Sequence, residues 1–123
     1  MRKPFIGGNW KMNTDSHSSV ELASGLKERL AETAGREVDV AIIPPFVYIP
    51  GVVQAVQASR IGVGGQDLYF EEKGAYTGEI SAAMLKDVGC SYVLCGHSER
   101  RHVLGEDDEL INKKLHAAIS GGL

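Results

Sequence analysis

Short apolar runs alternate with longer segments of helical periodicity along the whole chain, and this alternation restricts the fold more than any other feature of the sequence. The apolar runs begin near residues 5, 38, 61 and 91, so successive runs start 33, 23 and 30 residues apart. A strand, a crossover helix and the next parallel strand need a spacing of this size. The sequence therefore predicts an α/β fold of four parallel βα units in a single domain, residues 1–123.

The segments between the apolar runs carry signals for helix ends. Ser18 and Glu21 have the spacing of a capping box, Gly35 is placed to end the first helix, and Ser81 is a predicted N-cap. The predicted helices cover residues 18–33, a segment ending near 58, 82–88 and 107–120, between predicted strands at 5–10, 38–43, 61–65 and 92–95. The predicted apolar helix faces are Leu22, Leu26 and Leu30; Val52, Val53 and Val56; and Leu110, Ile111, Leu115, Ala118 and Ile119.

Composition and charge exclude several classes of protein. A net charge of −3 with interspersed signs argues against binding to nucleic acid, and no apolar run has the roughly 18 residues of a membrane span. Residues 1–8 contain no apolar stretch long enough for a secretory signal, and Cys90 and Cys95 form no disulfide framework, so we expect a cytoplasmic protein. The sequence contains no spacing typical of a metal site and no dinucleotide-binding GxGxxG pattern, so we expect neither a metal nor another cofactor.

Two polar side chains follow the first predicted strand. Asn9 and Lys11 are two residues apart on an extended segment, so both point toward the space that the strand end faces. In α/β folds, function lies at the carboxyl ends of the strands. An amide and an ammonium group there could bind a small, oxygen-rich anion, although a solvated lysine and a turn-forming asparagine would give the same pattern.

A histidine follows the fourth predicted strand. His97 comes directly after Gly96, at the junction between this strand and a helix. The backbone N–H groups at a helix N-terminus disfavour a second positive charge, so the imidazole is expected to be neutral there. Its position favours a catalytic role as strongly as a structural one.

Four motifs in the correct order resemble the triosephosphate isomerase family. They are residues 8–13 (GNWKMN), 66–67 (QD), 75–81 (AYTGEIS) and 96–101 (GHSERR). The resemblance covers essentially the whole chain and implies half of a (βα)₈ TIM barrel. It also implies the glycolytic interconversion of dihydroxyacetone phosphate and glyceraldehyde 3-phosphate, without a cofactor.

The resemblance assigns a role to each matching residue. Asn9 and Lys11 would bind the triose phosphate, with Lys11 also supplying positive charge, and His97 would be the neutral electrophile that polarises the carbonyl. Triosephosphate isomerase is itself a known example of a histidine kept neutral by a helix N-terminus. Glu99 and Ser98 would support these groups, while Thr77 and Gln66 would belong to a subunit interface of the family homodimer.

The chain departs from the family in length. TIM barrels run to about 250 residues, so these residues would be a truncated N-terminal half. The family's general base, a glutamate after the sixth strand, has no match among them, nor have the lid and the phosphate-binding loop. We therefore expect the isolated chain to be nearly inactive, and its partner to be a C-terminal half-barrel or a second copy. Two alternatives are a non-catalytic, self-associating half-barrel and a small flavodoxin-like binding domain.

Overall fold

A computed structural model describes residues 2–33 and 37–123, and the predicted helix end at Gly35 lies outside this part of the chain. The strands are β1 (Phe5–Asn9), β2 (Asp39–Ile43), β3 (Ile61–Gly65) and β4 (Tyr92–Val93). The helices are α1 (Ser16–Ala31), the 3₁₀ helix η1 (Phe46–Tyr48), α2 (Ile49–Ala55), α3 (Ala82–Asp87), α4 (Ser98–His102) and α5 (Asp108–Ser120).

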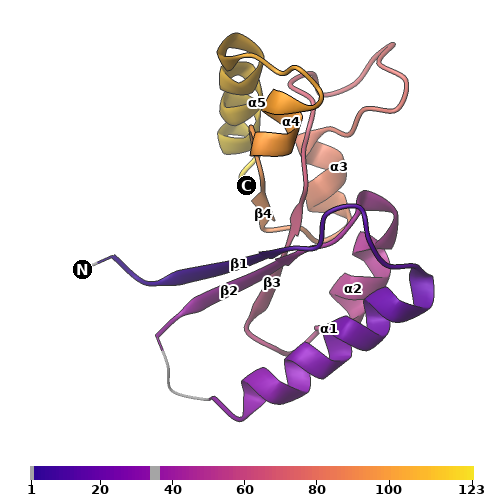
Figure 1. Cartoon of the computed structure of the whole chain (residues 1–123), viewed down its shortest axis with the longest axis vertical. Coiled ribbons are helices and arrows are strands. Elements are labelled where there is room, and N and C mark those ends of the chain that lie inside the picture. The colour runs from indigo at the N-terminus through magenta and orange to yellow at the C-terminus, as the bar shows by residue number, and fades with distance from the viewer. Residues whose placement is uncertain (1, 34–36) are drawn as a thin grey trace.

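The strands form one parallel sheet in the order β1-β2-β3-β4, so each βα unit lies beside the next (Figure 1). Phe5 is opposite Asp39, Val40 is opposite Ile61, and Gly64 is opposite Tyr92. The sheet curls into half of a (βα)₈ barrel, which confirms the predicted fold class. All four strands consequently end at the same rim.

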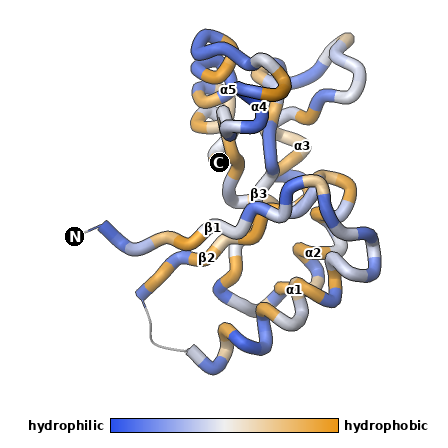
Figure 2. The backbone as a smooth tube through the Cα atoms, viewed as in Figure 1, coloured by the Kyte–Doolittle hydropathy of each residue, from blue (hydrophilic) through white to orange (hydrophobic). Residues whose placement is uncertain are grey.

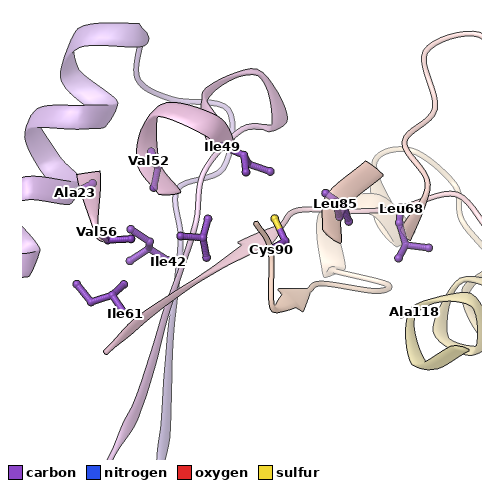
Figure 3. Packing of buried hydrophobic residues seen from close by; sticks show 11 residues of the cluster. Ala23, Ile42, Ile49, Val52, Val56, Ile61, Leu68, Leu85, Cys90 and Ala118 are labelled. Atoms are coloured by element: carbon purple, nitrogen blue, oxygen red, sulfur yellow. The ribbon is translucent and has the colours of Figure 1, made fainter. Parts of the chain in front are cut away.

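The outer face of the sheet packs on the helices. Ile42 and Val63 lie side by side on β2 and β3, and both are buried in the same cluster as Ala23 of α1 and Val52 of α2 (Figure 3). The cluster continues to Leu85 of α3 at the other end of the sheet. Figure 2 shows apolar residues on β1 and β2, whereas α1 alternates between apolar and polar residues. Of these two strands only β2 belongs to the buried core, since Phe5 and Ile6 of β1 are exposed.

The inner face of the sheet is lined with glycine on β3. The ring of Tyr92 covers this strand, and a Cβ atom at Gly62 would lie 2.5 Å from its Cε2 atom. The rings of Phe5 and Tyr92 approach each other with centroids 5.2 Å apart. Glycine at position 62 thus leaves the space that the aromatic ring of β4 occupies.

Two predicted details of the first helix are wrong. The N-cap is Asp15, whose Oδ1 accepts hydrogen bonds from the backbone N–H groups of His17 and Ser18. Ser18 completes the capping box by accepting a hydrogen bond from the Asp15 N–H, so the helix begins at Ser16 and not at the predicted residue 18. A carboxylate can accept two of the four N–H groups that the first turn leaves unpaired, as Asp15 does.

The predicted apolar faces are only partly buried. Leu22, Leu115 and Ile119 are 44%, 47% and 64% exposed, whereas Ser19 and Ala23 on α1 are fully covered. β4 is also shorter than predicted, since it ends at Val93. In contrast, the Ser81 cap was predicted correctly, since Ser81 Oγ accepts a hydrogen bond from the Met84 N–H. No helix in the described part of the chain is long and apolar enough to cross a membrane.

Candidate active site

The end of β1 turns sharply and presents Lys11 at the rim of the half-barrel. Asn9 Oδ1 accepts a hydrogen bond of 2.9 Å from the backbone N–H of Lys11. Lys11 itself has a φ of +56°, a left-handed conformation that is uncommon for a residue with a side chain. The amide of Asn9 therefore helps to hold a strained turn, as the turn-forming alternative for this residue predicted.

Lys11 and His97 converge on one carboxylate. Lys11 Nζ lies 2.7 Å from Glu99 Oε1, and His97 Nδ1 lies 3.6 Å from Glu99 Oε2. These residues come from opposite ends of the sheet, β1 and β4. The structure thus brings together three of the predicted site residues, with Asn9 supporting the first of them.

His97 is the N-cap of α4, at the junction where the sequence places it. Its Nδ1 accepts a hydrogen bond of 3.2 Å from the backbone N–H of Glu99. An imidazole nitrogen that accepts an N–H carries no proton, so the neutral ring has its proton on Nε2. His97 can therefore donate a hydrogen bond from Nε2 while α4 holds the other nitrogen.

The electrostatics of the site keep Glu99 ionised. The hydrogen bond from Lys11 lowers the pKa of Glu99, and the positive charge of Lys11 acts in the same direction. Lys11 and Glu99 are about half exposed, so salt screens this interaction. The pair provides a fixed ammonium group at the rim with its countercharge on one side.

The side chain of Gln66 links three strands at this rim. Gln66 follows β3, and its Nε2 donates hydrogen bonds to the backbone oxygens of Lys11, at 2.7 Å, and Ile43, at 3.1 Å. The first bond holds the strained turn of Lys11, and the second fixes that turn against the end of β2. Gln66 thus lies directly against the site.

Two other predicted residues are exposed and take no part in these contacts. Ser98 is exposed in the first turn of α4, next to His97. Thr77 is exposed in the segment between β3 and α3, which projects away from the sheet in Figure 1. The described residues contain no group of three histidine, cysteine, aspartate or glutamate side chains that could hold a metal ion.

Comparison with known proteins identifies the family. The triosephosphate isomerase family model matches residues 4–123. The chain belongs to the triosephosphate isomerase family. It is 47%, 49% and 51% identical over 123 residues to the triosephosphate isomerases of Thermoanaerobacter pseudethanolicus, Carboxydothermus hydrogenoformans and Moorella thermoacetica. Each match covers the whole chain and 48% of the relative, so the chain spans about half the length of these curated triosephosphate isomerases.

This triosephosphate isomerase family member also contains a charge cluster that the sequence analysis missed. Lys114 of α5 is 2% exposed, and its Nζ lies 2.9 Å from Oδ1 and 2.8 Å from Oδ2 of Asp67 and also binds Oε1 of Glu106. Arg100 Nε donates to Glu106 Oε2 at 2.5 Å and lies 3.0 Å from Asp67 Oδ2. The signal available was Lys114 itself, which falls on the helix face between Ile111 and Ala118.

Burial and pairing act in opposite directions on the two carboxyl groups of this cluster. Burial raises the pKa of Asp67, and the hydrogen bond from Lys114 offsets only part of that effect. Burial also raises the pKa of Glu106, but the hydrogen bonds from Lys114 and Arg100 outweigh it, so this pKa is lowered. The cluster therefore contains two positive and two negative groups whose charges depend on one another.

Proposed function

We propose that this chain forms the carbonyl-polarising half of a triosephosphate isomerase active site. The reaction would be the glycolytic interconversion of dihydroxyacetone phosphate and glyceraldehyde 3-phosphate in the cytoplasm. The observation that carries the proposal is the convergence of Lys11 and His97 on Glu99, at the strand ends where α/β barrels hold their active sites. Membership of the family supplies the substrate class.

The chemistry follows from the two donors. His97 Nε2–H donates a hydrogen bond to the substrate carbonyl oxygen, and the Lys11 ammonium group stabilises the negative charge as the enediolate forms. A preorganised donor of this kind contributes about 10²–10³-fold to the rate. Asn9 contributes by holding the Lys11 turn and, as in the family pattern, by binding substrate.

The reaction also needs a base that removes the proton from one carbon and returns it to the next. The family's glutamate base has no match in these 123 residues. General-base catalysis contributes about 10²–10⁴-fold, and phosphate anchoring and water exclusion add to this. We therefore expect very little turnover from the chain alone.

The surface area of the chain supports a partner that completes the barrel. A compact monomer of 13.2 kDa exposes about 6,400 Å². This chain exposes 7969 Å², an excess of about 1,500 Å², against the roughly 800 Å² that each partner buries in a standard interface. The relatives contain as much chain again as the matched part, so we propose that a complementary half-barrel covers this surface.

Exposed apolar side chains lie at both ends of the curled sheet. On the first strand, Ile6 is 61% exposed, and on α1, Val20 is 38% exposed. At the other end, Leu115 and Ile119 of α5 are exposed. A complementary half-barrel that pairs with the free edges of β1 and β4 would cover both groups with its own terminal helices.

A coupled isomerase assay tests the proposal. The chain would be assayed alone, and then with a separately expressed polypeptide corresponding to the second half of the Moorella thermoacetica relative. We expect activity only in the mixture, and a loss of about 10²-fold or more when His97→Gln replaces the parent chain. Activity of the chain alone that disappears in His97→Gln would contradict the missing base. An inactive mixture that nonetheless forms a 1:1 complex would contradict the isomerase proposal.

The second candidate is a non-catalytic assembly of two identical half-barrels. The free edges of β1 and β4 favour it, because a second copy could pair with both. Mass measurement in solution distinguishes the candidates. A homodimer that persists when the complementary half is added would favour the assembly, whereas conversion to a 1:1 complex would favour the split active site.

A further inference from the structure

Besides the ion pair between Lys11 and Glu99, a second set of contacts connects the turn that contains Lys11 with the helix that contains Glu99. Lys11 reaches Glu99 through its side chain and reaches Gln66 through its backbone oxygen. The next residue after Gln66 is Asp67, and the next residue after Glu99 is Arg100. Arg100 Nε lies 3.0 Å from Asp67 Oδ2, which completes the series.

The contact between Asp67 and Arg100 is partly buried. The side chain of Asp67 is 16% exposed and that of Arg100 is 31% exposed. Lys114 holds both carboxylate oxygens of Asp67, and Glu106 accepts a hydrogen bond from Arg100. Asp67 is thus held by α5 independently of its contact with α4.

The helix that Asp67 holds is the one that carries His97. α4 has only five residues, Ser98–His102, too few to be stable without tertiary contacts. Its Arg100 is anchored to the charge cluster, and the hydrogen bond between the Glu99 N–H and His97 Nδ1 lies in the adjacent turn. A shift of α4 would move His97 and Glu99 together relative to Lys11.

We propose that Asp67 is a positioning residue, which acts through Arg100 to hold the His97–Glu99 segment at its place opposite Lys11. This inference rests on the proposed function, since it assumes that His97 and Lys11 act on the same substrate. It assigns to Asp67 a role separate from substrate contact. The carboxylate acts by anchoring a short helix that has little stability of its own.

The test uses the full chain and reads His97 directly. In the parent, NMR of ¹⁵N-labelled protein should show an Nδ1 without a proton and a hydrogen-bonded Glu99 amide. Asp67→Asn removes one of the two carboxylates that hold Arg100, leaves the other, Glu106, in place, and keeps the side-chain size. We expect the His97 ring signals to move toward a mixture of tautomers and the Glu99 amide to exchange about tenfold faster.

A second variant and a control keep the test decisive. Arg100→Gln removes the same contact, together with the hydrogen bond from Arg100 to Glu106, and leaves Asp67 paired with Lys114, so it tests the proposal even if Asp67→Asn unfolds. Asp108→Asn is the control, since Asp108 pairs with the neighbouring Arg101, at 2.6 Å, and is almost fully exposed. The control should leave the His97 signals unchanged.

The outcomes separate this inference from the isomerase proposal. Changed His97 signals in both Asp67→Asn and Arg100→Gln, with an unchanged control, would support the positioning role. Unchanged His97 signals in a folded Arg100→Gln variant would overturn it, even if the reconstituted mixture is an active isomerase. Conversely, changed signals together with an inactive, fully assembled mixture would leave the positioning role intact and remove the proposed function.

Discussion

Lys11 Nζ and Glu99 Oε1 lie 2.7 Å apart, although 88 residues separate them in the sequence. This contact joins the first and fourth βα units, the two ends of the curled sheet. Because neighbouring strands in the sheet are also consecutive in the sequence, no pairing between strands brings these units together. The ion pair at the rim therefore depends on the curvature of the sheet, which brings the ends of its first and fourth strands close together.

Removing Lys11 should raise the pKa of Glu99. The hydrogen bond from Lys11 is the main cause of the lowered value, so Lys11→Met should return this pKa toward the ordinary carboxyl range. Because the folded-state pKa is lowered, the stabilisation is present above the ordinary carboxyl pKa and is lost as the pH falls through the lowered value. ¹³C NMR titration of Glu99 measures the change. Lys27→Met is the control, and an equal shift in both variants would contradict the pairing.

Cys90 should react slowly in the folded chain. Burial raises its thiol pKa to about 11, so only about a thousandth of it is thiolate at pH 8. In a Cys95→Ser background, a disulfide reagent at pH 8 should modify Cys90 about 100-fold more slowly than in the urea-unfolded chain. The absorbance of the released thiolate measures both rates. Equal rates in the two states would show that Cys90 is not protected by the core.

The strand order could be predicted from the sequence because buried parallel strands leave a simple signal. β3 matches its predicted bounds, residues 61–65, because an apolar run enriched in glycine ends abruptly at polar Gln66. The end of β4 could not be predicted in this way, since the apolar run continues through Leu94 and Cys95 although the strand ends at Val93 and one further hydrogen bond, from the Leu94 N–H to the Gly65 oxygen, joins this segment to β3. An apolar run in the sequence indicates which residues are buried, but it does not indicate where a strand ends.

Helix faces were predicted less well because a helix in a half-barrel has neighbours on only one side. Leu22 and Leu115 have helical spacing with other apolar residues, yet both are exposed. Under the proposed function, helices of the complementary half would cover them. On that proposal the helix faces suit a complete barrel, whereas this chain buries only those residues that face its own sheet and helices.

The candidate site was also only partly predictable from the sequence. Asn9, Lys11 and His97 could be found from the rule that function lies at strand ends. The partners of Lys114 could not, because Asp67 lies 47 residues away and its carboxylate is chosen by packing between β3 and α5. Local spacing therefore finds the groups at the rim and misses the buried groups that fix them.

Alanine at position 62 should destabilise the chain, and alanine at position 25 should not. A Cβ atom at Gly62 would lie 2.5 Å from the Tyr92 ring, so Gly62→Ala forces the ring to move, at a cost of about 1–3 kcal/mol. Gly25 lies in α1 with nothing within 4 Å of an added Cβ, so Gly25→Ala should stabilise by about 0.5–1 kcal/mol. Urea unfolding measures both.

A double-mutant cycle ties the cost at Gly62 to the aromatic ring. In a Tyr92→Ala background the space beside Gly62 is free, so adding Gly62→Ala should cost much less than in the parent. An equal loss of stability in both backgrounds would mean that the added Cβ atom clashes with a group other than the Tyr92 ring.

Lys114→Met should destabilise the chain strongly at neutral pH and only slightly in acid. The substitution leaves the carboxylates of Asp67 and Glu106 without the buried ammonium between them, a loss of about 3–5 kcal/mol. Both carboxyl pKa values should then rise, because burial is no longer offset. Folded-state pKa values above the unfolded ones mean that stability is retained at low pH and lost as the pH rises through the raised values.

Urea unfolding from about pH 4 to about pH 7 should therefore show a widening difference in the free energy of unfolding between Lys114→Met and the parent. Lys113→Met, on the same helix but half exposed, should stay within about 0.5 kcal/mol of the parent. A gap for Lys114→Met that does not change with pH would mean that lost packing, and not unpaired charge, causes the instability.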